Sequence, residues 1–407
     1  VRKKGLTQNT YGFVWDTNYK STYLDLTGGL ALQYFTCHHW GRLTYMADQE
    51  LAAKYMPEGS DYPYYDSDAH KGDYSGFIKA TGKITDWLHL FLDLQYRHVD
   101  YKTTGINDHF YDQKGTYNHQ ILDINKHYNF FNPKAGINLH WNSQRAYASV
   151  AISHREPERN NFTDNGKYPA PTAERVTDWE LGYEYNGSNW RAGVNFYDMT
   201  YHNQFVQTGE LSDIGENLTT NIKKSYRMGA EITAGYTPFK FLTLEGNAAL
   251  SRNRIKDFTE YVDNWDDKTN PATVQYDHST LAFSPSAILN GFLTIHFSGF
   301  EGIWHTNFVS RQYLDNTENE YRSLPCYSQT DLSFNYTLKF RKIWKPIKKI
   351  IVGIDLNNIF DRHYAAMGWV YSAISKSSGY TLDKRYYQIG FNPMAGFNMM
   401  GHISIYF

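Results

Sequence analysis

Long stretches of the sequence alternate between apolar and polar residues, and this pattern limits the fold more than any other feature. In the last stretch, from Phe397 to Phe407, every second residue is apolar or glycine. The stretches 328–340 and 228–236 alternate in the same way. Successive side chains of a β-strand point to opposite faces of a sheet, so a period of two predicts strands with one apolar and one polar face.

The chain has no apolar run long enough for a membrane-spanning helix. Runs such as Ile350–Val352 are far shorter than the ~20 residues that a helix needs to cross a bilayer. Aromatic residues make up 17% of the chain, with 35 tyrosines, yet the mean hydropathy is only -0.61. A transmembrane barrel has this composition, because half of each strand faces lipid and half faces a wet lumen. We therefore predict an all-β protein, a transmembrane antiparallel up-and-down β-barrel.

Fifteen strands are predicted, and the connections between them alternate in length. The strands lie near 9–16, 22–36, 73–84, 87–101, 130–141, 145–154, 176–186, 189–206, 222–236, 240–256, 284–297, 301–313, 326–340, 349–360 and 394–407. The short connections are 85–86, 142–144, 186–188, 237–239, 298–300 and 341–348, and the long ones are 37–72, 102–129, 155–175, 207–221, 257–283, 314–325 and 361–393. This asymmetry is typical of bacterial outer-membrane barrels and predicts periplasmic short turns and extracellular long loops.

Tryptophans lie next to the predicted short turns. They are Trp15, Trp87, Trp141, Trp190 and Trp344. Five turns with the same neighbour favour an aromatic girdle at the periplasmic membrane interface. The alternative is that these are ordinary core aromatics beside turns.

Charge, cysteines and the chain start add smaller constraints. The net charge of -2 argues against a nucleic-acid binder, which would be basic. Cys37 and Cys326 form no disulfide framework, although an oxidising compartment could pair them. Polar residues follow Val1–Lys4, where a signal peptide would have an apolar segment, so we expect a mature chain or a fragment.

Six motifs in a fixed order resemble those of TonB-dependent outer-membrane receptors. They are Ser153–Pro157, Pro171–Glu174 with Trp179–Tyr183, Asn195–Tyr197, Tyr226–Glu231, Asn357–Tyr364 and the terminal Phe407, which is similar to an outer-membrane assembly signal. Together they span nearly the whole chain. The form of the first motif and the tyrosine-rich loops look like receptors of the Bacteroidetes group.

This resemblance implies a barrel of 22 strands that is plugged by an N-terminal domain. Fifteen is an odd number, and bacterial single-chain barrels use an even one, so we expect about seven strands and the plug upstream. Residues 1–407 would then be the C-terminal portion of the barrel. The resemblance also implies a TonB complex that acts through the missing N-terminal region, and it leaves room for a surface lipoprotein partner.

Acidic residues recur on the polar faces of the predicted strands. The set assigned to the plug-facing lumen is Asp93, Glu231, Glu245, Asp331 and Asp355. A wide lumen must satisfy such charges with water, basic neighbours or a filling domain. We interpret most of them as contacts to the plug or as parts of a network in the wall, and a direct role in solute passage is the alternative.

The long loops are the predicted recognition surface. The candidate ligand-binding residues are His38, His39, Trp40, Arg155, Trp265 and Trp369. Two adjacent histidines could ligate a metal, but adjacent strand residues point to opposite sides, so no metal site is predicted. A structural clamp between Arg155 and Glu156 or Glu158 is favoured over ligand contact. The stretch 263–267 is rich in carboxylates but lacks the spacing of a calcium loop, which favours a solvated loop.

The leading hypothesis is an outer-membrane receptor that imports a scarce small nutrient by TonB-energised uptake. Iron-siderophore, haem and cobalamin complexes are the expected cargoes, and the protein itself needs no cofactor. The absence of nucleophile-elbow, phosphate-loop and zinc-protease motifs argues against an enzyme. The alternatives are a passive porin and a surface adhesion or assembly protein anchored by its barrel in outer-membrane lipid.

Overall fold

The computed structural model describes the chain except residues 57–60, 114–115, 165–167, 212–216, 268–269 and 341–346, and it describes no side chains within 109–118 and 211–217. The chain divides into two compact units. Unit 1 contains Val1–Ile84, His89–Ala135 and Ala151–Thr163, and unit 2 contains Thr85–Leu88, Gly136–Val150 and Asp164–Phe407. No helix in the described residues is long and apolar enough to span a bilayer.

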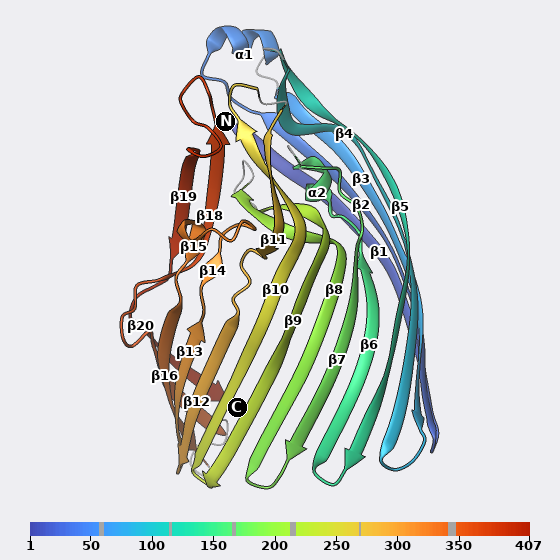
Figure 1. Cartoon of the computed structure of the whole chain (residues 1–407), viewed down its shortest axis with the longest axis vertical. Coiled ribbons are helices and arrows are strands. Elements are labelled where there is room, and N and C mark those ends of the chain that lie inside the picture. The colour runs from blue at the N-terminus through green and yellow to red at the C-terminus, as the bar shows by residue number, and fades with distance from the viewer. Residues whose placement is uncertain (57–60, 114–115, 165–167, 212–216, 268–269, 341–346) are drawn as a thin grey trace. The chain divides into compact units, whose positions relative to one another are not determined.

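Unit 1 consists mainly of long antiparallel strands. Its elements are β1 (Arg2–Lys20), β2 (Leu24–Leu43), β3 (Tyr62–Lys83), most of β4 (Leu88–Gln113), the first part of β5 (Thr116–Trp141), the end of β6 (Gln144–Arg155), and the helices α1 (Gln49–Tyr55) and α2 (Arg159–Thr163). Pairing runs β1–β2, β2–β3 and β3–β4 (Figure 1). Helix α1 begins where the Asp48 carboxylate accepts hydrogen bonds from the backbone N–H groups of Glu50 and Leu51, each at 3.0 Å.

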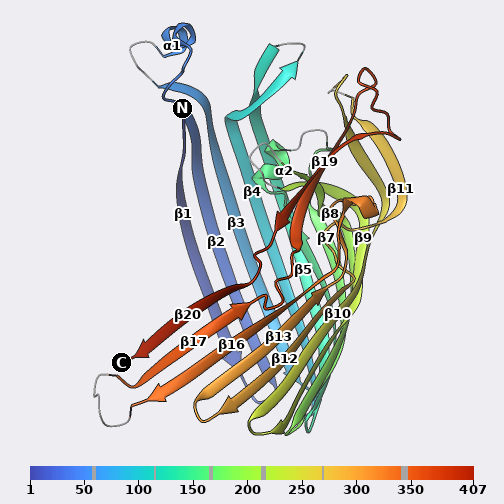
Figure 2. The same cartoon turned by 90° about the vertical axis from the view of Figure 1, so that its left-hand side faces the viewer.

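Unit 2 continues the same architecture. Its main strands are β7 (Glu174–Asn186), β8 (Trp190–Leu211), β9 (Asn217–Phe239), β10 (Leu242–Asn264), β12 (Ala287–Phe297), β13 (Phe300–Val309), β16 (Tyr327–Lys339), β17 (Lys349–Asn357) and β20 (Asn398–Tyr406). Each pairs antiparallel with the next in this order, as the adjacent ribbons in Figure 2 show from β12 to β20. Within unit 2, Ser298 and Gly299 both have positive φ, which is the geometry of a two-residue hairpin turn between β12 and β13.

Each of the fifteen predicted strands overlaps a strand of the structure. They correspond to β1–β10, β12, β13, β16, β17 and β20. The antiparallel up-and-down fold is therefore confirmed. Of the predicted girdle, Trp15, Trp87, Trp141 and Trp190 are exposed at 38–53%, and Trp344 lies outside the described residues.

The long connections differ from the prediction, because pairing continues far into them. Strands β4 and β5 extend through most of 102–129, and β2 and β3 through much of 37–72. Further strands lie inside three other predicted loops: β11 (Ala272–Thr280), β15 (Ser323–Leu324), β18 (Ala365–Ile374) and β19 (Tyr386–Pro393). The short strand β14 (Gln312–Tyr313) lies at the end of the predicted strand 301–313. Alternation is lost there because both faces of these hairpins are polar or partly buried, and backbone pairing does not require a period of two.

Strand register in unit 2 gathers the apolar residues on one face. Ile354 of β17 stands opposite Phe334 of β16 and Gly401 of β20, and Leu244 of β10 stands opposite Leu293 of β12. Large side chains of this face are exposed. Ile403, for example, keeps 67% of its surface exposed. A continuous exposed apolar surface is a liability in water but is what the lipid-facing side of a barrel needs. The acids fall on the opposite face.

An arginine on the apolar face should therefore damage the protein more than one on the polar face. Ile232 lies in the middle of the apolar face of β9, and Thr233 is its neighbour on the polar face. We expect Ile232→Arg to lower the free energy of unfolding by about 2–4 kcal/mol, measured by denaturant titration of the full-length protein in liposomes.

The matched control is Thr233→Arg, which puts the same charge on the other face and should cost far less. Equal losses for the two variants would contradict the assignment of faces.

Candidate functional site

The predicted plug-facing acids lie on the polar face, where three of them bind to the wall itself. Asp331 accepts hydrogen bonds from the Asn358 backbone N–H and from Gln329 Nε2, each at 2.8 Å. Asp355 accepts from Ser333 Oγ at 2.6 Å. Glu245 pairs with Arg191. The wall-network interpretation thus has direct partners, and contact with a plug remains a prediction.

The other two acids have a looser setting. Asp93 of β4 stands across from Lys79 of β3 in the strand register. Glu231 of β9 lines a pocket of about 330 Å³ together with Arg227 and Tyr197. For these two side chains as well, contact with a plug stays a prediction.

The motif 357–364 connects the ends of two strands of unit 2 through hydrogen bonds. Asn358 is buried at 1% exposure with a φ of 52°, and its side chain binds Arg362 O at 3.0 Å and Ala395 O at 3.1 Å. Asp361, also at positive φ, accepts from the Phe397 backbone N–H at 2.9 Å. These residues tie the end of β17 to the start of β20, so the motif is explained by turn geometry.

A buried charge cluster organises the long-loop end of unit 1 around Glu156. The carboxylate binds Arg97 through two hydrogen bonds of 2.8 Å and Lys71 Nζ at 2.8 Å. Arg97 also binds Asp73, at 2.6 and 2.9 Å. Burial alone would raise the pKa of Glu156, but the hydrogen bonds from Arg97 and Lys71 outweigh it and lower that pKa to about 2. Glu156 thus has partners other than the predicted Arg155.

The two predicted histidines point to opposite faces of β2. His38 Nδ1 binds Asp68 Oδ1 at 2.9 Å. His39 instead lines a pocket of about 200 Å³ with Lys71, Glu156 and other residues of unit 1. Their joint use as metal ligands is therefore excluded by the alternation of the strand.

Trp40 and Arg155, the other candidates in unit 1, lie away from this pocket lining. Trp40 packs its ring over Gly5 of β1, where any side chain would collide with it, and Lys3 Nζ lies 5.9 Å from the ring centroid. Arg155 is exposed at the end of β6. Among the described residues, no group of three or more histidine, cysteine or acidic side chains is placed to hold a metal ion.

A second buried network joins three segments of unit 2: β10, the connection between β14 and β15, and the residues before β19. Glu260 Oε1 of β10 binds Arg385 at 2.7 Å and Arg322 at 3.2 Å, and Arg322 binds Asp315 at 2.5 Å. The four side chains are exposed at only 5–10%. The two positive and two negative charges attract each other, and this attraction offsets the free energy cost of removing them from water. Beside them, Leu314, Leu324 and Val370 form an apolar cluster.

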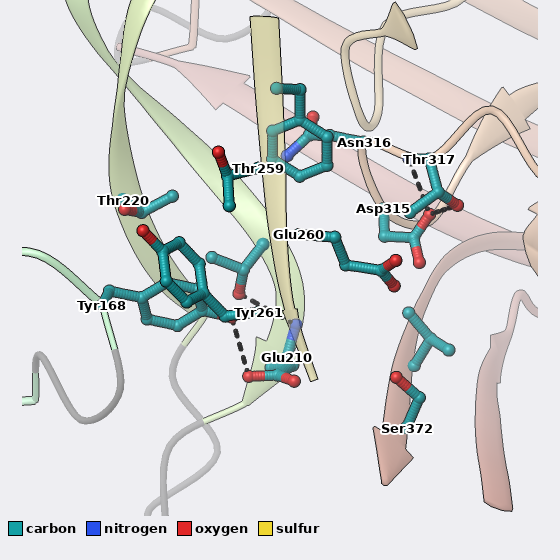
Figure 3. A pocket seen from close by; sticks show the side chains of 13 residues that line it. Tyr168, Glu210, Thr220, Thr259, Glu260, Tyr261, Asp315, Asn316, Thr317 and Ser372 are labelled. Atoms are coloured by element: carbon teal, nitrogen blue, oxygen red, sulfur yellow. Dashed lines mark hydrogen bonds between the residues drawn. The ribbon is translucent and has the colours of Figure 1, made fainter. Parts of the chain in front are cut away.

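The cavity next to this network is too small for a nutrient complex. Figure 3 shows it lined by Tyr168, Glu210, Glu260 and Asp315, and its volume is about 30 Å³, the space of a water molecule. Tyr168 donates its hydroxyl to Glu210 at 2.9 Å. Burial and the Glu210 charge raise the pKa of Tyr168 well above its usual value, so the phenol stays protonated. This cavity is a structural junction.

An aromatic surface stands on β18 and β19 of unit 2. We call it the aromatic ledge, and it consists of Trp265, Trp369, Tyr371, Tyr380 and Tyr386. Trp265 donates its ring N–H to Tyr371 Oη at 2.9 Å, and its ring centroid lies 5.0 Å from that of Tyr386 and 6.2 Å from that of Tyr380. Trp369 shares a face of β18 with Tyr371 and stands over Gly390. The structure thus brings the two predicted tryptophans to one surface.

The neighbouring acidic stretch holds the ledge in place. Asp266 accepts hydrogen bonds from the Lys376 backbone N–H at 2.6 Å and from the hydroxyls of Ser377 and Ser375 at 2.5 and 3.0 Å. The Ser377 hydroxyl foremost, followed by the other donors, lowers the pKa of Asp266. The loop is exposed, as expected, and it is also anchored, because the Asp266 carboxylate caps the turn at 375–378.

Sequence reasoning missed the residues that build both buried networks. Arg97 lies on the predicted strand 87–101 and Lys71 in the predicted loop 37–72, and the pairing of β3 with β4 places both where they reach Glu156. Arg322 and Arg385 lie in predicted loops, 62 and 125 positions from Glu260. No local pattern marks such pairs. Cys37 is buried, Cys326 is exposed, and both are free thiols.

The comparison with protein families decides what kind of barrel this is. The sequence matches the family described as TonB dependent receptor-like, beta-barrel over residues 3–359. The chain belongs to this family. Its members are transporters and receptors rather than enzymes. The comparison with curated protein sequences finds no match.

Solved receptor structures share the fold across the whole chain. The copper transporter OprC has a TM-score of 0.71 at 13% identity and covers 99% of this chain and 57% of its own. The ferric yersiniabactin uptake receptor FyuA of Yersinia pestis has a TM-score of 0.61 at 15% identity, with 100% and 55% covered. The siderophore receptor PiuA of Acinetobacter baumannii has 0.64 at 11%, with 98% and 56%. The chain thus spans a little over half the length of these receptors.

Acid should weaken the receptor through Glu156. Its pKa in the folded state lies below the ordinary 4.5, so its ionised form stabilises the fold above about pH 4.5, and this contribution is lost as the pH falls toward 2. We expect Glu156→Gln to cost roughly 2 kcal/mol at neutral pH and to lose that deficit in acid, measured by circular dichroism melting across pH. Glu158→Gln, an exposed neighbour, is the control. A constant deficit at every pH would contradict the assignment.

Removing Arg322 should open the second network. Arg322→Ala leaves Glu260 and Asp315 with a single buried cation, so hydrogen exchange in 257–262 and 315–324 should rise at least tenfold, measured by mass spectrometry. The control is Arg311→Ala, whose partner Glu320 is exposed at 74%, and exposed pairs contribute little. Equal exchange in the two variants would show that the buried network does not hold this region.

Proposed function

We propose that this chain forms the transport barrel of an outer-membrane receptor for TonB-energised uptake of a scarce nutrient held in a metal complex. The observation that carries the proposal is the family match over residues 3–359. In such a barrel the exposed apolar face meets lipid and the polar face, with Asp93, Glu231 and Asp355, surrounds a plug. The connections with the ledge and the Glu156 cluster lie outside the cell, and the short turns lie in the periplasm.

The cargo is an iron-siderophore, haem or cobalamin complex. Copper and ferric siderophores are named for the similar structures, which supports a metal-containing cargo here. The aromatic ledge adds chemistry suited to a flat or conjugated ligand, because aromatic rings stack on such surfaces. Trp265 keeps 42% of its surface exposed, so part of its ring is available to a ligand.

The cargo would bind to a surface that is already ordered before binding. Asp266 fixes the turn beside the ledge, and Arg322 and Arg385 fix the hairpins that carry it. A surface that is ordered before binding loses less entropy on binding, which favours the high affinity needed for a scarce nutrient. Release into the cell would need the plug and the TonB complex. A surface lipoprotein could assist capture.

Uptake assays test the proposal in a strain that lacks the receptor gene. We expect import of a labelled iron-siderophore, haem or cobalamin complex to fall to background in this strain and equally in a strain without TonB, and to return when the full-length gene is restored. Import that continues without TonB would favour a passive porin. Normal import of all three classes in the deletion strain would argue against the cargo and favour a surface adhesion or assembly role.

The ledge has its own test. Trp265→Ala in the full-length receptor should weaken binding of the imported complex roughly tenfold, because a stacking contact contributes about 1 kcal/mol or more. Equilibrium binding to purified receptor measures this. The control is Tyr321→Ala, an aromatic side chain exposed at 90% outside the ledge. Unchanged affinity in Trp265→Ala would place recognition elsewhere.

A further inference from the structure

A basic groove lies on β8–β11 of unit 2, whose ribbons Figure 1 labels, and it is lined by residues of these strands. The groove has a volume of about 680 Å³. Its basic lining residues are His202, Lys224, Arg252, Arg254, Lys256 and His278. None of them belongs to the polar face, the ledge or the buried networks, so the proposed uptake leaves this groove without a role.

Strand register places these residues in rows directly above the apolar face. Met228 stands opposite Arg252, and the next pair on the same face is Tyr226 with Arg254. One pair further on, Lys224 stands opposite both His202 and Lys256. Lys256 in turn faces His278 of β11. The same face that carries Ile232 and Leu250 thus becomes basic toward the long connections.

The depth of the groove matches a membrane border. From Trp190, next to a short turn, to His202 the strand β8 advances twelve residues. At about 3.3 Å per residue and a tilt of about 40°, this is a rise of about 30 Å, and the apolar band of such barrels is about 25 Å tall. The rows begin lower, at Arg252, which is level with Asp198, eight residues from Trp190 and about 20 Å above it. They therefore run from the upper part of the apolar band to the depth of the headgroups.

The groove holds more positive charge than its own side chains neutralise. Among the described residues, Arg254 pairs with Glu318 at 2.6 Å, while Lys224, Arg252 and Lys256 form no ion pair. Lys256 Nζ lies 5.9 Å from the Tyr226 ring centroid. The one acid in the lining is Asp198, which accepts a hydrogen bond from Thr200 at 3.1 Å. Several cations that converge without counter-ions match a phosphate group.

We propose that this groove binds the phosphorylated headgroup of a glycolipid in the outer leaflet, with the acyl chains lying on the apolar face below. Lys224, Arg252 and Lys256 would contact the phosphate oxygens, and Tyr226 would pack against the sugar. The proposal goes beyond nutrient uptake and relies on it only for the outward direction of the long connections. A soluble anion does not explain why the cations adjoin the lipid-facing band.

Lipid binding to the purified full-length receptor tests the proposal. The groove variant is Lys224→Gln, Arg252→Gln and Lys256→Gln combined, and the control variant carries Lys240→Gln, Lys376→Gln and Lys384→Gln, which remove the same charge elsewhere. Native mass spectrometry should show phosphorylated lipid A bound to the wild type and the control variant, and at least tenfold less bound to the groove variant. Lipid A stripped of phosphate should bind the wild type as weakly as the groove variant binds the phosphorylated form.

Two results would overturn the assignment. Equal retention of phosphorylated lipid A by the groove and control variants would show that the cations do not bind it. Inorganic pyrophosphate that displaces lipid A at equimolar concentration would show a site for soluble anions. Assembly is checked for each variant by the shift in electrophoretic mobility on heating. Cargo import is measured in a separate assay. If the wild type imports cargo but does not bind phosphorylated lipid A, only this inference is wrong. If it binds lipid A but does not import cargo, only the proposed uptake is wrong.

Discussion

Backbone hydrogen bonding in a medium without water is the constraint on which the rest of this structure depends. Lipid offers no partner for an N–H or C=O group, so every strand in the bilayer must pair along its whole length. The continuous ladders of each unit meet this requirement. Once pairing is fixed, alternation sends Ile232, Leu244 and Ile354 to one face and Glu231, Glu245 and Asp355 to the other. Lipid contact and a polar wall follow from the same register.

Pairing also carries the strands beyond the bilayer, where a different physics stabilises them. Outside lipid, the hairpins of unit 2 bury side chains against each other, and Arg322 and Arg385 offset the cost of burying Glu260 and Asp315. In unit 1 the same task falls to Arg97, Lys71 and Glu156. In each unit these ion pairs therefore hold the paired segments of the long connections together.

Prediction from sequence succeeded where a local repeat carries the information. The strands β1–β10, β12, β13, β16, β17 and β20 were predicted because a period of two residues is visible over a dozen positions, and the polar-face assignment of Asp331 followed from it. It failed for β18 and β19, whose residues are partly buried on both faces and so show no alternation. It also missed the hydrogen bonds of the exposed Asp266, because a carboxylate that caps a turn 110 positions away leaves no local trace.

The sequence by itself determined the strands, their faces and the family of the barrel, because each is written in the spacing of neighbouring residues. Only the tertiary structure decided which side chains meet. Glu156 meets Lys71 and Arg97, and Trp265 meets Tyr371, across 59 to 106 positions of the chain. The basic rows from Lys224 to Arg252 depend on the register between the neighbouring strands β9 and β10. A shift of one residue in this register would exchange the faces and undo these rows, while the sequence would look the same.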